Sequence, residues 1–137
     1  MSTNGHRIGL MLYSVRDASS VDLHATLREI ANIGYDGVEV FDLHGHEPGT
    51  VRAWLDELGL VACARHCRLD EIERTLPALV EEARALGWTR LVISWVDPAE
   101  LHDGTLARIA AVARDAAAAG LELGYHNHDA EVEQGFL

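Results

Sequence analysis

The chain has 137 residues, of which 48% are hydrophobic and 24% charged, and this is enough for one globular domain with a sizeable core. Its formal net charge is −11, from 22 acidic and 11 basic side chains. Affinity for phosphate backbones comes largely from basic residues, so this balance argues against nucleic acid and anionic membrane surfaces as partners. No segment approaches the ~18 consecutive apolar residues of a membrane helix. The polar N-terminus lacks an apolar signal core, so we expect a cytoplasmic protein.

A junction of helix, glycine and strand recurs four times along the chain. Its glycines are Gly34, Gly59, Gly87 and Gly120, each at the end of an amphipathic pattern and directly before an apolar run. Glycine suits a helix C-terminus because it adopts the left-handed conformation without steric cost. The spacing of the glycines is close to the ~30 residues of one βαβ step. The sequence therefore predicts repeated (β/α) units.

Hydrophobic periodicity gives the approximate position of each element. The expected strands cover residues 8–13, 37–41, 60–65, 91–95 and 121–126, and the expected helices cover 22–33, 48–58, 70–86 and 105–119. Ser19 or Ser20 could cap the first helix, and Pro77 is expected to break the third. In the fourth helix, Leu106, Ile109 and Ala110 belong to the expected buried face. Residues 131–137 show no assignable pattern.

Strict alternation of strands and helices predicts an α/β domain with a parallel sheet. Such a sheet either stays open and doubly wound or closes into a (β/α)8 barrel. The Gly-x-Gly-x-x-Gly and Gly-Lys-Ser/Thr motifs of nucleotide-binding open sheets do not occur, which favours the barrel. A barrel needs eight units and ~250 residues, whereas this chain holds about four and a half units. We therefore predict a single domain, residues 1–137, that forms a partial (β/α)8-type barrel and does not close alone.

Polar side chains gather where the expected strands end, which is the functional edge of α/β folds. Five of the eight histidines fall there: His44, His46, His66, His126 and His128. His44 and His46 lie in a glycine-containing loop and are interpreted as solvated. His66 either bonds a backbone carbonyl or contacts substrate. Glu39, inside an apolar strand, needs a partner or a chemical role, because a buried carboxylate is costly.

The densest polar segment follows the fifth strand and includes His126, Asn127, His128 and Glu131. Turn formation alone does not require these residues. Imidazole and carboxylate groups are ligands for zinc, manganese or cobalt, and a bound cation would polarise a substrate oxygen. Cys63 and Cys67 are interpreted as buried thiols, with a redox pair as the alternative.

Several stretches resemble the sugar phosphate isomerase/epimerase family, the xylose-isomerase-like TIM barrels. They are residues 8–17 (IGLMLYSVRD), 33–40 (IGYDGVEV), 58–60 (LGL), His66, 85–87 (ALG) and 124–131 (GYHNHDAE). They follow one another in order over nearly the whole chain. The resemblance is to the N-terminal half of the family, strands one to five of its barrel.

That resemblance implies a divalent-metal-dependent enzyme that isomerises, epimerises or dehydrates sugars or polyols by removing a proton next to a carbonyl. It implies catalytic roles for Glu39 and His66, and metal binding (Mn, Mg, Co or Zn) by His126 and Glu131. The implied substrate-binding residues are Tyr13, Trp95, Asn127 and His128. A second copy or another chain would complete the barrel. The alternative hypothesis is a non-catalytic half barrel that dimerises and binds a polyol or a metal.

Overall fold

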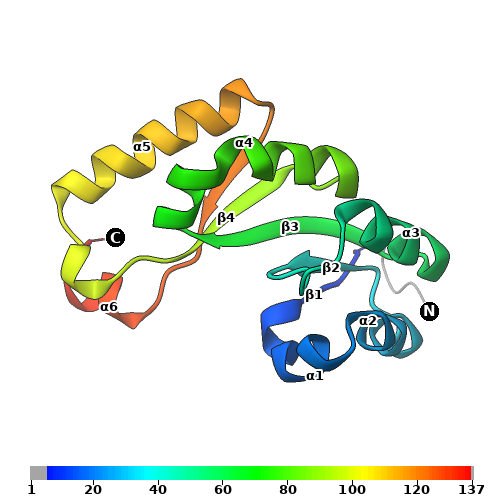
Figure 1. The fold of residues 1–137 in the computed structure, drawn as a ribbon. Coiled ribbons are helices and arrows are strands. Elements are labelled where there is room, and N and C mark those ends of the chain that lie inside the picture. The colour runs from blue at the N-terminus through cyan, green and yellow to red at the C-terminus, as the bar shows by residue number, and fades with distance from the viewer. Residues whose placement is uncertain (1–5, 137) are drawn as a thin grey trace. The chain divides into compact units, whose positions relative to one another are not determined.

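The structure is a computed structural model that describes residues 6–136, in which strands and helices alternate as the glycine junctions predict (Figure 1). The strands are β1 (Gly9–Met11), β2 (Gly37–Val40), β3 (Val61–Arg68), β4 (Arg90–Trp95) and β5 (Glu122–Tyr125). The α-helices are α1 (Arg16–Val21), α2 (Leu23–Ile33), α3 (Pro48–Leu58), α4 (Leu69–Leu86), α5 (Asp103–Ala118) and α6 (Asp129–Glu133). Two short 3-10 helices, η1 (Leu12–Val15) and η2 (Pro98–Glu100), follow β1 and β4.

The strands follow one another in the order β1-β2-β3-β4-β5. The pairs β1/β2, β2/β3 and β4/β5 are parallel, which confirms the predicted α/β class. The four junction glycines all have positive φ, from 68° at Gly59 to 105° at Gly34, as their predicted role in ending helices requires. Across residues 6–136, no helix combines the length and apolar character needed to cross a membrane.

The chain divides into two compact units. Unit 1 comprises the chain up to Arg65 together with Glu81–Trp88, and unit 2 comprises His66–Val80 and the chain from Thr89 onward. In unit 1, α2 buries the predicted face of Leu23, Leu27 and Ile30. Burial of one such side chain stabilises the fold by roughly 1.5–3 kcal/mol.

The N-terminus of α2 is capped by Asp22, whose carboxylate accepts a hydrogen bond from Ala25 N at 2.9 Å. The prediction that Ser19 or Ser20 caps this helix is wrong. Both serines lie in α1, which the sequence did not predict, and their hydroxyls donate to the carbonyls of Arg16 and Asp17. Serine often makes such local bonds, which compete with capping.

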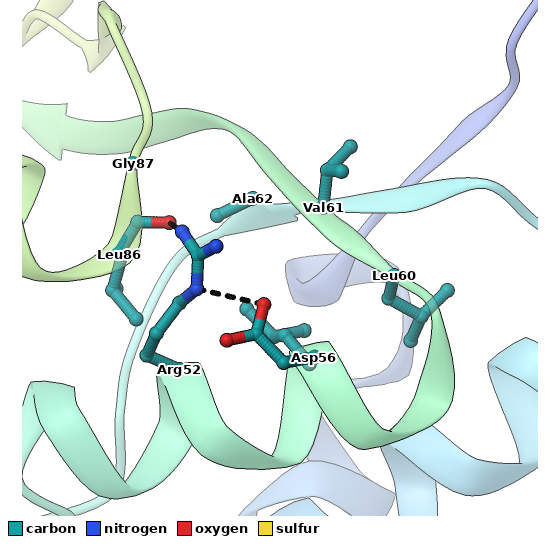
Figure 2. Close-up of a pocket in the computed structure, with 8 residues that line it drawn as sticks. Arg52, Asp56, Leu60, Val61, Ala62, Leu86 and Gly87 are labelled. Carbon is teal, nitrogen blue, oxygen red and sulfur yellow. Dashed lines mark hydrogen bonds and ion pairs between the residues drawn. The ribbon is translucent and has the colours of Figure 1, made fainter.

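Arg52 ties α3 to the end of α4 within unit 1 (Figure 2). Its Nε donates to Asp56 Oδ1 at 2.8 Å, and its Nη1 donates to the carbonyl oxygen of Leu86 at 3.1 Å. A helix leaves its last carbonyls without intrahelical partners, so this guanidinium satisfies one of them. Gly87 lies so close that a Cβ there would come within 2.7 Å of Arg52 Nη1. Gly87 therefore has two roles: it adopts the positive φ that ends α4, and it leaves space for the guanidinium of Arg52.

Two predictions about helices in unit 2 are wrong. Pro77 does not break α4, which continues through it. Pro77 is exposed, so water can reach the carbonyl that loses its intrahelical donor, and buried Ile72 and Leu79 hold the helix on either side. In α5, Leu106 is 46% exposed, and the buried residues are Thr105, Val112 and Ala116.

Candidate functional site

Three histidines come together in unit 2 at the ends of β3 and β5. His66 lies in β3 and is buried, with 4% of its surface exposed. Its ring centroid is 5.9 Å from that of His126. The rings of His126 and His128 are 5.0 Å apart. Trp95, the last residue of β4, packs edge-on against His128 with centroids 5.0 Å apart. We call His66, His126 and His128 the imidazole cluster.

The register of β4 and β5 places His126 in this cluster. Its backbone N–H donates to Ile93 O at 2.9 Å, which extends the parallel ladder one step beyond Tyr125. The side chain of His126 is exposed, and His128 is half-buried at the N-terminus of α6. Asn127 between them is exposed, with its Nδ2 3.4 Å from His128 O. The cluster therefore presents at least one imidazole to solvent.

Glu131 fixes the segment that carries His128. Its side chain is 1% exposed, and it accepts hydrogen bonds from the Tyr125 hydroxyl at 2.8 Å and from the His128 backbone N–H at 2.9 Å. Burial raises the pKa of Glu131, but the hydrogen bonds from Tyr125 and His128 outweigh it, so the pKa is lowered overall. Burial and the bond to Glu131 together raise the pKa of Tyr125. Glu131 is thus an ionised carboxylate that holds β5 and α6 together.

The described residues do not make up a complete metal site. Within residues 6–136, no three His, Cys, Asp or Glu side chains converge as a metal ion requires. Both oxygens of Glu131 already accept hydrogen bonds. His126 and Glu131 therefore remain predicted ligands, and further donors are needed for metal binding.

Tyr13 and Glu39 belong to unit 1. Tyr13 is 44% exposed in η1, and its ring meets Phe41 edge-on with centroids 4.8 Å apart. The guanidinium carbon of Arg16 lies 4.4 Å from the centroid of the Tyr13 ring. Glu39 is half-buried in β2, between buried Val38 and Val40. Tyr13 therefore offers an aromatic surface, and Glu39 a carboxylate on an otherwise apolar strand.

Of the two loop histidines of unit 1, His44 is less solvated than the sequence suggested, whereas His46 is exposed as expected. His44 is half-buried with φ of 50°, and its Nε2 lies 3.1 Å from the hydroxyl oxygen of Ser19, which is itself buried. His46 is exposed but packs edge-on against Trp54, which also stacks on His24. These contacts give both loop histidines a packing role.

Both cysteines are thiols, as predicted, and they lie in β3. Cys67 is buried, while Cys63 is half-buried and its Sγ donates to Val38 O at 3.1 Å. These thiols contribute to packing around the strand.

A pocket of about 160 Å³ lies beside Trp95 in unit 2, and the sequence did not predict it. Its polar and aromatic lining comes from the ends of β3 and β4, the start of α4, the residue before η2, η2 itself and α5. It comprises Arg68, Asp70, Trp95, Asp97, Glu100 and Arg108. Arg68 pairs with Asp70 at 3.2 Å. Arg108 pairs with Glu100 and with Glu73 of α4. Trp95 lines the pocket and also contacts His128, so its side chain lies between the pocket and the imidazole cluster.

Comparisons with solved structures identify the fold of the chain. No protein-family model matches the chain, and no curated protein does. A solved sugar phosphate isomerase/epimerase from Parabacteroides distasonis is similar, with a TM-score of 0.72 and 19% identity over 90% of this chain and 55% of that one. A xylose isomerase domain containing protein from Salmonella typhimurium has a TM-score of 0.67 and 14% identity, over 91% of this chain and 50% of that one.

A third similar structure is a probable 3-DHS dehydratase from Bacillus anthracis, with a TM-score of 0.70 and 11% identity over 96% of this chain and 59% of that one. The chain thus spans little more than half the length of these structures. Its five parallel strands and intervening helices match the corresponding part of their barrels. The chain therefore has the fold of half of a TIM barrel.

Proposed function

We propose that this chain supplies part of the active site of a sugar or polyol isomerase or epimerase, which removes a proton next to a carbonyl. The observation that carries the proposal is the imidazole cluster, where three histidines and Trp95 meet at the strand ends of a half barrel. Imidazole exchanges protons near neutral pH, which suits acid–base chemistry. An indole beside it suits the apolar face of a sugar.

Within this proposal, Glu39 and His66 each act as an acid–base group. Tyr13, Trp95, Asn127 and His128 bind the substrate. All eleven basic side chains of this chain are arginines. It therefore brings no lysine for Schiff-base chemistry, and proton transfer by its own residues falls to carboxylate and imidazole groups.

A divalent cation (Mn, Mg, Co or Zn) is proposed on His126 and Glu131, together with donors from a complementing chain. When bound, it would polarise the oxygen of the substrate carbonyl. The described residues alone lack a complete metal site. Glu39 and His66 are proposed to transfer protons and are not assigned to the metal.

Exchange of a single proton tests the proposal at its elementary step. The chain is incubated in D2O with a ketose or an inosose, with each divalent metal in turn, and NMR follows the signal of the hydrogen next to the carbonyl. We expect exchange above the protein-free rate. Glu39→Gln and His66→Gln should each reduce it by about 100-fold or more, the usual range for general acid–base catalysis.

Matched controls are available on the exposed surface. Glu57 in α3 and His102 before α5 are both exposed, so Glu57→Gln and His102→Gln should leave the exchange rate unchanged. Equal losses in the test and control variants, or no exchange with any metal, would contradict the proposal. The second outcome would favour the non-catalytic alternative, a half barrel that only binds a polyol or a metal.

Association with a second copy is also proposed. In the part of the chain that the structure describes, β1 pairs only with β2 and β5 only with β4. Unpaired strand edges favour pairing with another chain. Light scattering on the purified protein is expected to give twice the monomer mass of 15.0 kDa. A monomer at all concentrations would rule out self-association and leave a different complementing chain as the proposed partner.

A further inference from the structure

The pocket beside Trp95 carries a charge pattern that bears on the kind of ligand it takes. Its lining includes two arginines and three carboxylates: Arg68, Arg108, Asp70, Asp97 and Glu100. Each arginine is already paired with a carboxylate. We propose that this pocket binds a neutral sugar or polyol and disfavours a phosphate ester. The inference rests on the proposed function and specifies its substrate class.

Arg108 would be the natural phosphate ligand, but three of its nitrogens are engaged. Nε and Nη2 donate to the two oxygens of Glu73 at 2.9 and 2.8 Å, and Nη1 donates to Glu100 at 3.1 Å. A fork held by a carboxylate in this way cannot form the same paired bonds with a phosphate. Arg108 therefore orders the pocket wall and contributes no net positive charge to it.

Backbone N–H groups at helix N-termini are the other common ligands for phosphate. Here, carboxylates lie at or beside these helix N-termini. The first turn of α4 contains Asp70 and Glu71, and Asp97 before η2 accepts a hydrogen bond from Ala99 N at 2.9 Å. A dianionic phosphate would meet these carboxylates at close range, where like charges repel.

The same features suit a polyhydroxylated neutral ligand. The pocket is small, about 160 Å³, and it is lined by carboxylates, arginines and one indole. Sugar hydroxyls donate hydrogen bonds to carboxylates such as Asp97 and Glu100, and the C–H face of the ring packs on an indole such as Trp95. The edge contact between Trp95 and His128 connects this ligand to the imidazole cluster.

A matched pair of ligands tests the inference: D-fructose and D-fructose 6-phosphate, titrated calorimetrically into the full chain at low ionic strength. We expect the neutral ketose to bind at least about tenfold more tightly. Glu100→Gln removes one negative charge and releases one nitrogen of Arg108. The difference in affinity between the neutral ketose and its phosphate ester should therefore become smaller. Glu57→Gln, on the exposed surface of unit 1, should leave it unchanged.

Tighter binding of the phosphate ester would overturn the inference while leaving sugar binding, and hence the proposed function, intact. No binding of either ligand would overturn the assignment of the pocket. A preference that Glu100→Gln leaves unaltered would also overturn it, because the charge would then act elsewhere. The D2O exchange experiment tests the proposed function, and the ligand titration tests the pocket. Failure of one can therefore be told apart from failure of the other.

Discussion

Replacing Arg65 with methionine is expected to lower the free energy of unfolding by about 3–5 kcal/mol, the range for removing one partner of a buried ion pair. Arg65 lies in β3 and is 8% exposed. Its Nε donates to Glu82 Oε1 of α4 at 3.0 Å, and its Nη1 donates to the carbonyl oxygen of Phe41. The variant would withdraw both donors, and the Glu82 side chain, 14% exposed, has little access to water in their place.

Urea unfolding followed by circular dichroism measures this change. The double variant Arg65→Met/Glu82→Leu should recover most of the lost stability, because apolar residues can replace a buried ion pair. Arg84 and Glu81 form a comparable pair on the surface, with side chains 69% and 70% exposed. Arg84→Ala should therefore change stability by less than about 1 kcal/mol. Similar effects at Arg65 and Arg84 would contradict the prediction.

The repeat pattern predicted most of the fold because it depends on local chemistry. Gly34, Gly59, Gly87 and Gly120 all take the left-handed conformation that a helix end requires. The elements that the sequence did not reveal, α1 and α6, are six and five residues long. Helices that short contain too few turns for a periodic signal. In α5, alanines on all sides obscured the buried face, and Leu106 was wrongly assigned to it.

The candidate site was predictable to the extent that it follows strand ends. His66, Trp95, His126 and His128 were selected because parallel strands bring their carboxyl ends to one edge, and the structure places these four in contact. The pairing of Arg108 with Glu73 was not predictable, since the two are 35 positions apart. Charged side chains on predicted helices give no sign of which partner they will meet.

The family resemblance assigned Glu131 to metal binding, and nothing in the sequence indicated the hydrogen bonds that this side chain accepts. Tyr125, six positions away, supplies a hydrogen bond that gives Glu131 a structural role as well. That bond requires β5 to end and α6 to turn back on it, and α6 gave no signal in the sequence. The pocket beside Trp95 was missed for a related reason, because η2 and α5 complete its wall.

Replacing Glu131 with glutamine should cost about 2–3 kcal/mol of stability at neutral pH, the upper part of the range for a buried hydrogen-bonding group. Glutamine keeps one oxygen acceptor and turns an NH2 group toward a second donor. The His128 backbone N–H can keep its acceptor only if the Tyr125 hydroxyl accepts a bond from the NH2 group instead of donating, and both bonds lose the charged carboxylate. Exposed Glu133 lies in the same helix, and Glu133→Gln should change stability by less than about 0.5 kcal/mol.

The loss at Glu131 should also depend on pH. The pKa of Glu131 is lower in the folded protein than in the unfolded chain. Its ionised form therefore adds stability that is fully present above the unfolded pKa, about 4.3, and that disappears as the pH falls through the folded pKa. Urea midpoints measured from pH 7 downward should show the original chain and Glu131→Gln beginning to converge as the pH falls below the unfolded pKa. A difference that stays constant over this range would mean that the charge of Glu131 contributes nothing, and that its bonds to β5 and α6 act only through their geometry.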